Sequence, residues 1–94
     1  MPNKPWEKLH LDFKGPIPGG KYLLVVIDRY SRYPEVEIVT STNVITVVRK
    51  LNKIFASHGI PEVLITDNGP PFNRKDFWQY MKELGVSHKF STPY

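Results

Sequence analysis

The 94-residue chain contains no cysteine, which excludes disulfides, thiolate nucleophiles and cysteine-based zinc sites. No apolar run approaches the roughly 18 residues of a membrane helix and no signal peptide precedes the first predicted strand, so we expect a soluble intracellular protein with no membrane partner. The net charge of +4 is compatible with a polyanionic partner but is common among ordinary domains. This length predicts one domain, residues 1–94.

The first predicted element is a strand over 6–13, because apolar and polar residues alternate there. Leu9 and Leu11 share one face of this strand. His10 and Asp12 share the other face. Asp is disfavoured inside strands, so Asp12 is either a solvated carboxylate on an exposed strand or a residue kept for chemistry.

Two further strands are predicted before the pattern changes. Glycines and prolines at 15–20 predict a loop. The nearly continuous apolar run at 21–30 predicts a central strand covered on both faces. Alternation returns at 33–39, so the three strands together predict an antiparallel meander.

A helix is predicted over about 43–58, where apolar residues recur at helical spacing. The β-branched residues of its first half are equally typical of a strand, and length and flanking residues favour the helix. Ser41 or Thr42 can cap its start, while Gly59 and Pro61 end it.

The remaining elements are a strand at 62–66, a helix capped by Asn73 and ended by Gly85, and a strand at 86–90. The order β-β-β-α-β-α-β predicts an α/β fold with a mixed five-stranded sheet and helices packed on it.

The stretch LITDNGPPF, residues 64–72, has two interpretations. Asp-Asn-Gly is a common turn composition, because Asp and Asn bond their own backbone and Gly tolerates positive φ. If the first and fourth strands are neighbours, however, Asp12 and Asp67 could face each other at the strand ends. Two adjacent carboxylates repel unless a divalent cation lies between them, and Mg²⁺ and Mn²⁺ prefer oxygen ligands of this kind.

Four stretches together resemble a known family: PWEKLHLDFKGPIP, YLLVVIDRYSRYPEV, HGIPEVLITDNGPPFNRKDF and LGVSHKFSTPY. They are similar to the catalytic core of integrases from gypsy-class LTR retrotransposons, relatives of retroviral integrases. The resemblance extends over essentially the whole chain in the expected order. It implies a ribonuclease H-like fold, here incomplete at the carboxyl-terminal end.

The resemblance also implies a site. Asp12 and Asp67 correspond to the first two acids of the family's Asp-Asp-Glu triad, which are catalytic and hold two Mg²⁺ or Mn²⁺ ions. The implied activity is metal-dependent processing of DNA 3′ ends and their transfer into target DNA. The third acid of the pattern would fall beyond Tyr94, and Glu83 is better explained by the solvated face of a helix. We therefore expect the 94 residues alone to be a partial catalytic core without activity.

The implied partner is double-stranded DNA, both element ends and target, which places the parent enzyme in the nucleus. Possible DNA contacts are Asn68, His10, Lys89 and Tyr94, with His88 beside them; for His10, a hydrogen-bonded surface histidine is the alternative. An apolar sheet surface left open would favour self-association.

Two other functions remain open. One is a domesticated, non-catalytic domain that binds DNA or protein. The other is a nuclease acting on RNA–DNA hybrids, against which the TDNGPPF stretch argues.

Overall fold

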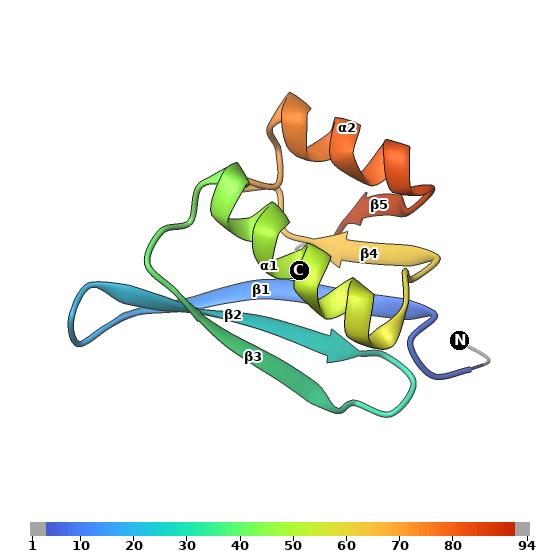
Figure 1. Cartoon of the computed structure of the whole chain (residues 1–94), viewed down its shortest axis with the longest axis horizontal. Helices are drawn as coiled ribbons and strands as arrows, with labels where there is room; N and C mark the ends of the chain where they lie inside the picture. Colours follow the sequence, from blue (N-terminus) through green and yellow to red (C-terminus); the bar gives the residue numbers. More distant parts are fainter. Residues whose placement is uncertain (1–3, 92–94) are drawn as a thin grey trace.

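The computed structural model describes residues 4–91 and contains five strands and two helices (Figure 1). In chain order these are β1 (Lys8–Ile17), β2 (Lys21–Asp28), β3 (Pro34–Val39), α1 (Val44–His58), β4 (Val63–Thr66), α2 (Lys75–Leu84) and β5 (Ser87–Phe90). The predicted order of elements is confirmed.

All five strands form one mixed sheet in the order β3-β2-β1-β4-β5. The pairs β1–β2 and β2–β3 are antiparallel, which confirms the meander. The pairs β1–β4 and β4–β5 are parallel, because α1 and α2 return the chain to the end of the sheet where the next strand must start. The central position of β1 places it directly beside β4.

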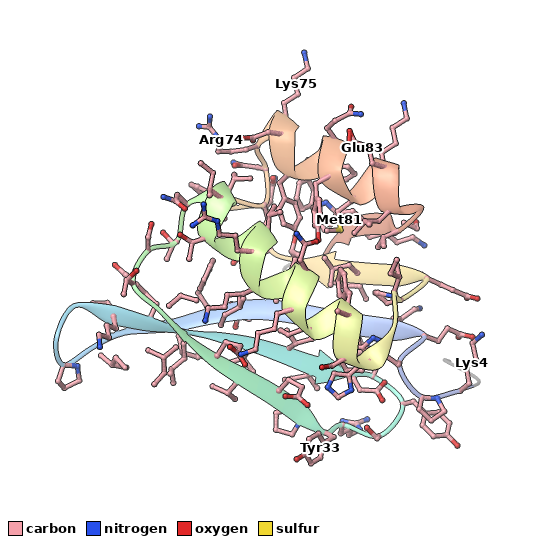
Figure 2. The ribbon with its side chains drawn as sticks, in the orientation of Figure 1. Lys4, Tyr33, Arg74, Lys75, Met81 and Glu83 are labelled. Carbon is pink, nitrogen blue, oxygen red and sulfur yellow. The ribbon has the colours of Figure 1, made fainter. Side chains whose placement is uncertain are left out.

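The helices cover one face of the sheet, and the core lies beneath them (Figure 1). Leu9 and Leu11 on β1 are fully buried there, together with Val47 and Leu51 on α1. On α2, Met81 lies on the side facing the sheet and is 1% exposed, whereas Lys75 extends away from the protein (Figure 2). The 3.6-residue period of each helix therefore separates a core side from a solvent side.

Strand β1 is longer than the sequence suggested. The breakers at 15–20 predicted a loop, but the strand continues to Ile17 and only 18–20 form the turn. A register shift between Lys14 and Ile17 accommodates Gly15 and the proline after it, which has no N–H to donate to the ladder.

The predicted helix caps lie one or two residues before the true N-cap positions. Asn43 caps α1 by accepting a 2.8 Å hydrogen bond from the Thr46 N–H, so neither Ser41 nor Thr42 is the cap. At α2 the N-cap position is occupied by Arg74, which makes no side-chain cap bond. Asn73 instead donates its side-chain amide to the Asn68 carbonyl at 3.3 Å, so its polar group stabilises the preceding loop.

The sheet face opposite the helices exposes apolar side chains. Ile27, Val36 and Ile38 are 36%, 48% and 58% exposed, and they alternate along β2 and β3 with residues that face the helices. No helix within residues 4–91 is long and apolar enough to cross a membrane.

Candidate metal site at the ends of β1 and β4

The two predicted acids lie on neighbouring strands. Parallel pairing sets Leu9 opposite Leu64 and His10 opposite Ile65. The same register continued by two residues sets Asp12 beside Asp67, which directly follows the last residue of β4. Both acids alternate with buried residues, so both belong to the sheet face that the helices leave uncovered.

Asp12 is held within β1 by its own neighbours. Its Oδ1 accepts a 2.8 Å hydrogen bond from the Phe13 N–H, and its Oδ2 lies 3.4 Å from Lys14 Nζ. The Asp12 side chain is 43% exposed, so solvent reaches it. Lys14 thus places a positive charge beside Asp12 Oδ2, and a cation that bound this oxygen would compete with it.

Asp67 is held by the loop that follows it. Its Oδ1 accepts a 2.8 Å hydrogen bond from the Gly69 N–H, which is the turn predicted from Asp-Asn-Gly. A Cβ on Gly69 would lie 3.1 Å from that same oxygen, so any side chain at this position would crowd the carboxylate. Among residues 4–91, no hydrogen-bond partner is recorded for Oδ2 of Asp67.

Phe72 anchors this loop. It is 1% exposed, stacks on Phe13 with ring centroids 5.4 Å apart, and meets Phe77 edge-on at 5.4 Å. Because Phe13 follows Asp12 and Phe72 ends the Asp67 loop, this stack joins the segments that carry the two acids.

The donor chemistry of the pair fits a hard divalent cation, since carboxylate oxygens are the preferred ligands of Mg²⁺ and Mn²⁺. The pair does not make a complete site: no group of three His, Cys, Asp or Glu side chains suited to a metal exists within residues 4–91. Glu83 lies on the solvent side of α2, where Gln79 Nε2 is 3.5 Å from its Oε1, so it is not the missing ligand (Figure 2).

Of the predicted DNA contacts, two lie on the sheet face that carries the acids and one lies in the loop after β4. His10 and Lys89 both pair with Ile65, so they lie on the face that carries the two acids. Asn68 is exposed in the loop after Asp67. Tyr94 lies outside the described residues. None of these positions is itself a test of DNA binding.

His88 is not a surface residue, and its suggested DNA contact is wrong. It is 7% exposed, and burial lowers its pKa to about 4, because the charged imidazolium would lose its hydration. Its Nε2 lies 2.7 Å from Oγ1 of Thr66, and Thr66 donates its hydroxyl to the Asp67 carbonyl at 2.9 Å. Sequence patterns missed both Thr66 and Lys14; the polar Thr inside an otherwise apolar strand was the available signal.

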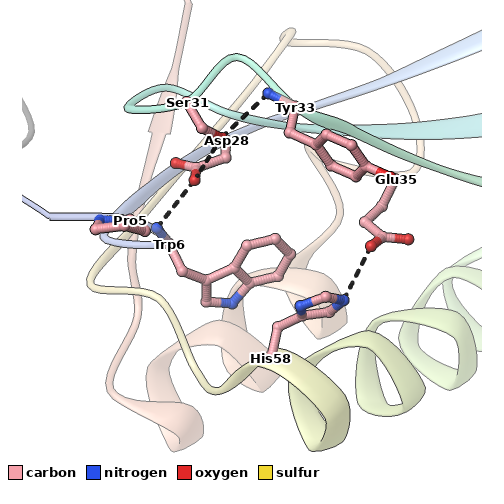
Figure 3. A pocket seen from close by; sticks show the side chains of 7 residues that line it. All are labelled: Pro5, Trp6, Asp28, Ser31, Tyr33, Glu35 and His58. Carbon is pink, nitrogen blue, oxygen red and sulfur yellow. Dashed lines mark hydrogen bonds and ion pairs between the residues drawn. The ribbon is translucent and has the colours of Figure 1, made fainter.

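A separate hollow of about 580 Å³ lies where β1 begins and β2 ends, and Figure 3 shows its lining. Both of its carboxylates, Asp28 and Glu35, already have partners in the chain. The Asp28 carboxylate accepts bonds from the Trp6 N–H, the Tyr30 N–H and the Ser31 hydroxyl. Burial raises the pKa of Asp28, but these bonds outweigh it and the net shift is downward. Asp28 is therefore a structural residue of the turn between β2 and β3.

Comparison with known proteins gives a consistent assignment. The family model described as "Integrase core domain" matches residues 2–94. The chain is 40% identical over 94 residues to the uncharacterised protein K02A2.6 of Caenorhabditis elegans, covering 100% of this chain and 7% of the relative. It is 32% identical over 96 residues to the Pro-Pol polyprotein of feline foamy virus, covering 99% and 8%. The chain thus spans less than a tenth of either relative.

Solved structures show the same fold. One is the structure of the simian T-cell lymphotropic virus intasome in complex with PP2A regulatory subunit B56 gamma. This chain superposes on a chain of that structure with a TM-score of 0.89 and 20% identity, covering 99% of this chain and 37% of that one. The HTLV-2 integrase catalytic core domain in complex with magnesium, in its trimeric form, gives 0.87 and 18%, covering 97% and 63%. The ribonuclease H-like sheet predicted from the sequence is thereby confirmed, and the chain belongs to the integrase core domain family.

Proposed function

We propose that this chain supplies the first two acidic ligands of a Mg²⁺- or Mn²⁺-dependent DNA integration site in a longer protein. Asp12 and Asp67 are the ligands, and the reactions are hydrolytic trimming of DNA 3′ ends and transfer of those ends into target DNA. We further propose that the parent element is a gypsy-class LTR retrotransposon and that the parent acts in the nucleus. The 94 residues alone supply two acids and are not expected to catalyse.

One observation supports this proposal above the others: the β1–β4 register, continued by two residues, puts Asp12 beside Asp67 on one face of the sheet, where β4 ends. Neither acid is needed for the core, because both side chains lie away from it. The turn interpretation of Asp67 accounts for Oδ1 only, since Gly69 occupies that oxygen and leaves Oδ2 available as a ligand.

When bound, a divalent cation supplies activation of the attacking oxygen and stabilisation of the leaving 3′-oxygen. The chain's own residues hold the two carboxylates in place. The Phe13 N–H and the Gly69 N–H fix one oxygen of each carboxylate, so the second oxygen of each is the one that a cation would take. Lys14, freed from Asp12, would be available to a DNA phosphate.

The DNA surface that we propose is the sheet face that the helices leave uncovered, in the region around the two acids. Its proposed contacts are His10, Asn68 and Lys89, together with Tyr94 from the segment that follows. Such contacts to phosphates would make binding strongly salt-dependent. We also propose self-association through the exposed apolar residues of β2 and β3, because exposed apolar surface of this kind favours association.

The metal ligands can be tested with Mn²⁺ and water proton relaxation. Wild-type protein is expected to bind Mn²⁺ weakly, and Asp67→Asn is expected to reduce the affinity at least several-fold. Asp76→Asn is the matched control: within residues 4–91, the ion pair of this exposed carboxylate on α2 is with Arg74, at 3.6 Å. Equal Mn²⁺ responses from wild type and Asp67→Asn would remove Asp67 from the site.

The non-catalytic binding domain is the competing function, and DNA binding without metal separates the two. An integration site predicts that Mg²⁺ or Mn²⁺ strengthens binding of duplex DNA and that Asp67→Asn abolishes this gain. Metal-independent DNA binding that is unaffected by Asp67→Asn would favour the non-catalytic domain.

A further inference from the structure

Asp67 is connected to the interior of the protein by two consecutive hydrogen bonds. Thr66 Oγ1 donates to the Asp67 carbonyl at 2.9 Å, and His88 Nε2 lies 2.7 Å from that same Oγ1. Thr66 is fully buried and His88 is 7% exposed, so water does not compete for the bond between them. The bond to the Asp67 carbonyl is partly buried. The series runs from β5 through β4 to the first residue after the strand.

The direction of these bonds follows from the number of protons. A threonine hydroxyl has one proton, which Thr66 gives to the Asp67 carbonyl, so Oγ1 can only accept from His88. His88 must then hold its proton on Nε2. Its buried Nδ1 has no hydrogen-bond partner among the described residues, as expected for the unprotonated nitrogen of that tautomer, since an unpaired N–H there would cost more.

The imidazole ring is fixed by aromatic neighbours. Trp78 lies against it with ring centroids 4.1 Å apart, and Phe77 and Phe90 meet it edge-on at 5.1 and 5.4 Å. Two of these rings come from α2 and one from β5 itself. The donor is therefore held in one orientation by packing, as a precise site requires of its supporting residues.

We infer that Thr66 and His88 are positioning residues for Asp67. Backbone pairing ends at Thr66, whose carbonyl accepts the Ser91 N–H at 2.7 Å, and the Asp67 peptide lies beyond the ladder. The Thr66 hydroxyl fixes the carbonyl of Asp67 while the Gly69 N–H fixes its Oδ1. These two bonds restrain the Asp67 peptide and one oxygen of its carboxylate, while Oδ2 has no partner among the described residues.

The role of these residues in metal binding rests on the proposed function, whereas their effect on the Asp67 peptide does not. Outer partners of this kind typically change metal affinity 10- to 100-fold. We therefore expect Thr66→Val, which keeps the shape and loses the hydroxyl, to weaken Mn²⁺ binding by about tenfold. Thr66→Ser and His88→Gln retain a hydroxyl and a donor respectively, and both should stay within about twofold of wild type.

The test has a metal-free and a metal-bound measurement on the same 94-residue chain. In metal-free ¹⁵N spectra, Thr66→Val should shift the amide resonances of Asp67, Asn68 and Gly69 and speed their hydrogen exchange, while Thr66→Ser should not. Mn²⁺ affinity is then measured by water proton relaxation. Val47→Ala is the control for lost stability, because Val47 is fully buried on α1 and touches neither acid; it should change neither readout.

The two measurements separate the two claims. Unchanged Asp67 and Gly69 resonances in folded Thr66→Val would overturn the positioning role, whatever the metal does. Shifted resonances in a protein whose wild type shows no Asp67-dependent Mn²⁺ binding would support the positioning role and refute the proposed function. If His88 variants fail to fold, the Thr66→Val and Thr66→Ser pair alone decides the question.

Discussion

Burial of His88 predicts a specific loss of stability in mild acid. The perturbation is a change of pH from 7 to 5 in wild type and in His88→Gln, which keeps a donor toward Thr66 and removes the titrating ring. The folded protein holds the His88 pKa at about 4, below the ordinary histidine value of 6.5, because burial disfavours the charged ring. Between these two values the unfolded chain binds a proton that the folded chain does not.

The sign and size follow from linkage. Stability rises with pH wherever the unfolded state binds more protons, so the contribution of His88 is full above pH 6.5 and is lost as the pH falls toward 4. At 1.36 kcal/mol per pKa unit, the whole shift corresponds to about 3 kcal/mol, of which about 2 kcal/mol disappears between pH 7 and 5.

Urea unfolding at pH 7, 6 and 5 measures the effect. The difference in unfolding free energy between wild type and His88→Gln should shrink by about 2 kcal/mol over this range, since both proteins share every other titrating group. Val47→Ala lowers stability without removing a titrating group, so its curve should run parallel to wild type. Parallel curves for wild type and His88→Gln would refute the argument that His88 is buried and neutral.

Three further predictions concern local stabilisation. Asn43→Ala should lower the unfolding free energy by about 1 kcal/mol and Tm by about 4–8 °C, because it removes the α1 cap. Thr42→Ala should change stability by less than about 0.5 kcal/mol, and thermal melts that rank the two variants otherwise would exclude Asn43 as the cap. Lys53 Nζ and Lys50 Nζ lie 3.2 and 3.4 Å from Glu37 Oε1. Glu37→Gln should therefore lower the unfolding free energy by up to about 1 kcal/mol at low salt and by less at 1 M NaCl, and a loss in urea melts that does not depend on salt would contradict the ion pairs. Ile38→Thr should reduce self-association, measured by sedimentation, without loss of stability, whereas Val39→Thr, at a 1% exposed position, should destabilise the protein. If Ile38→Thr associates as strongly as wild type, the open sheet face is not the cause of association.

Much of the fold was predictable because local and global signals agree. Alternation along β1 separated Leu9 and Leu11 from His10 and Asp12. The proposed pairing of Asp12 with Asp67 depended on the condition that the first and fourth strands are neighbours, and the structure confirms this strand order.

Two of the predictions that were wrong are the cap of α1 and the exposure of His88. Ser41, Thr42 and Asn43 are consecutive potential caps, and only the backbone path into α1 selects Asn43. His88 looked accessible because its strand is short and polar. It is buried by Trp78 and by other rings that come mainly from α2. This is a tertiary contact, and the alternation of residues within β5 does not predict it.

The adjacency of Asp12 and Asp67 is most directly tested by cross-linking, which the absence of native cysteine makes unambiguous. In the double variant Asp12→Cys with Asp67→Cys, a disulfide should form on mild oxidation, because neighbouring strands lie about 5 Å apart and disulfides need Cα separations of roughly 4.4–6.8 Å. Asp12→Cys with Asp76→Cys should remain reduced under the same conditions. A folded Asp12→Cys, Asp67→Cys protein that stays reduced, or cross-links only between molecules, would contradict the shared site.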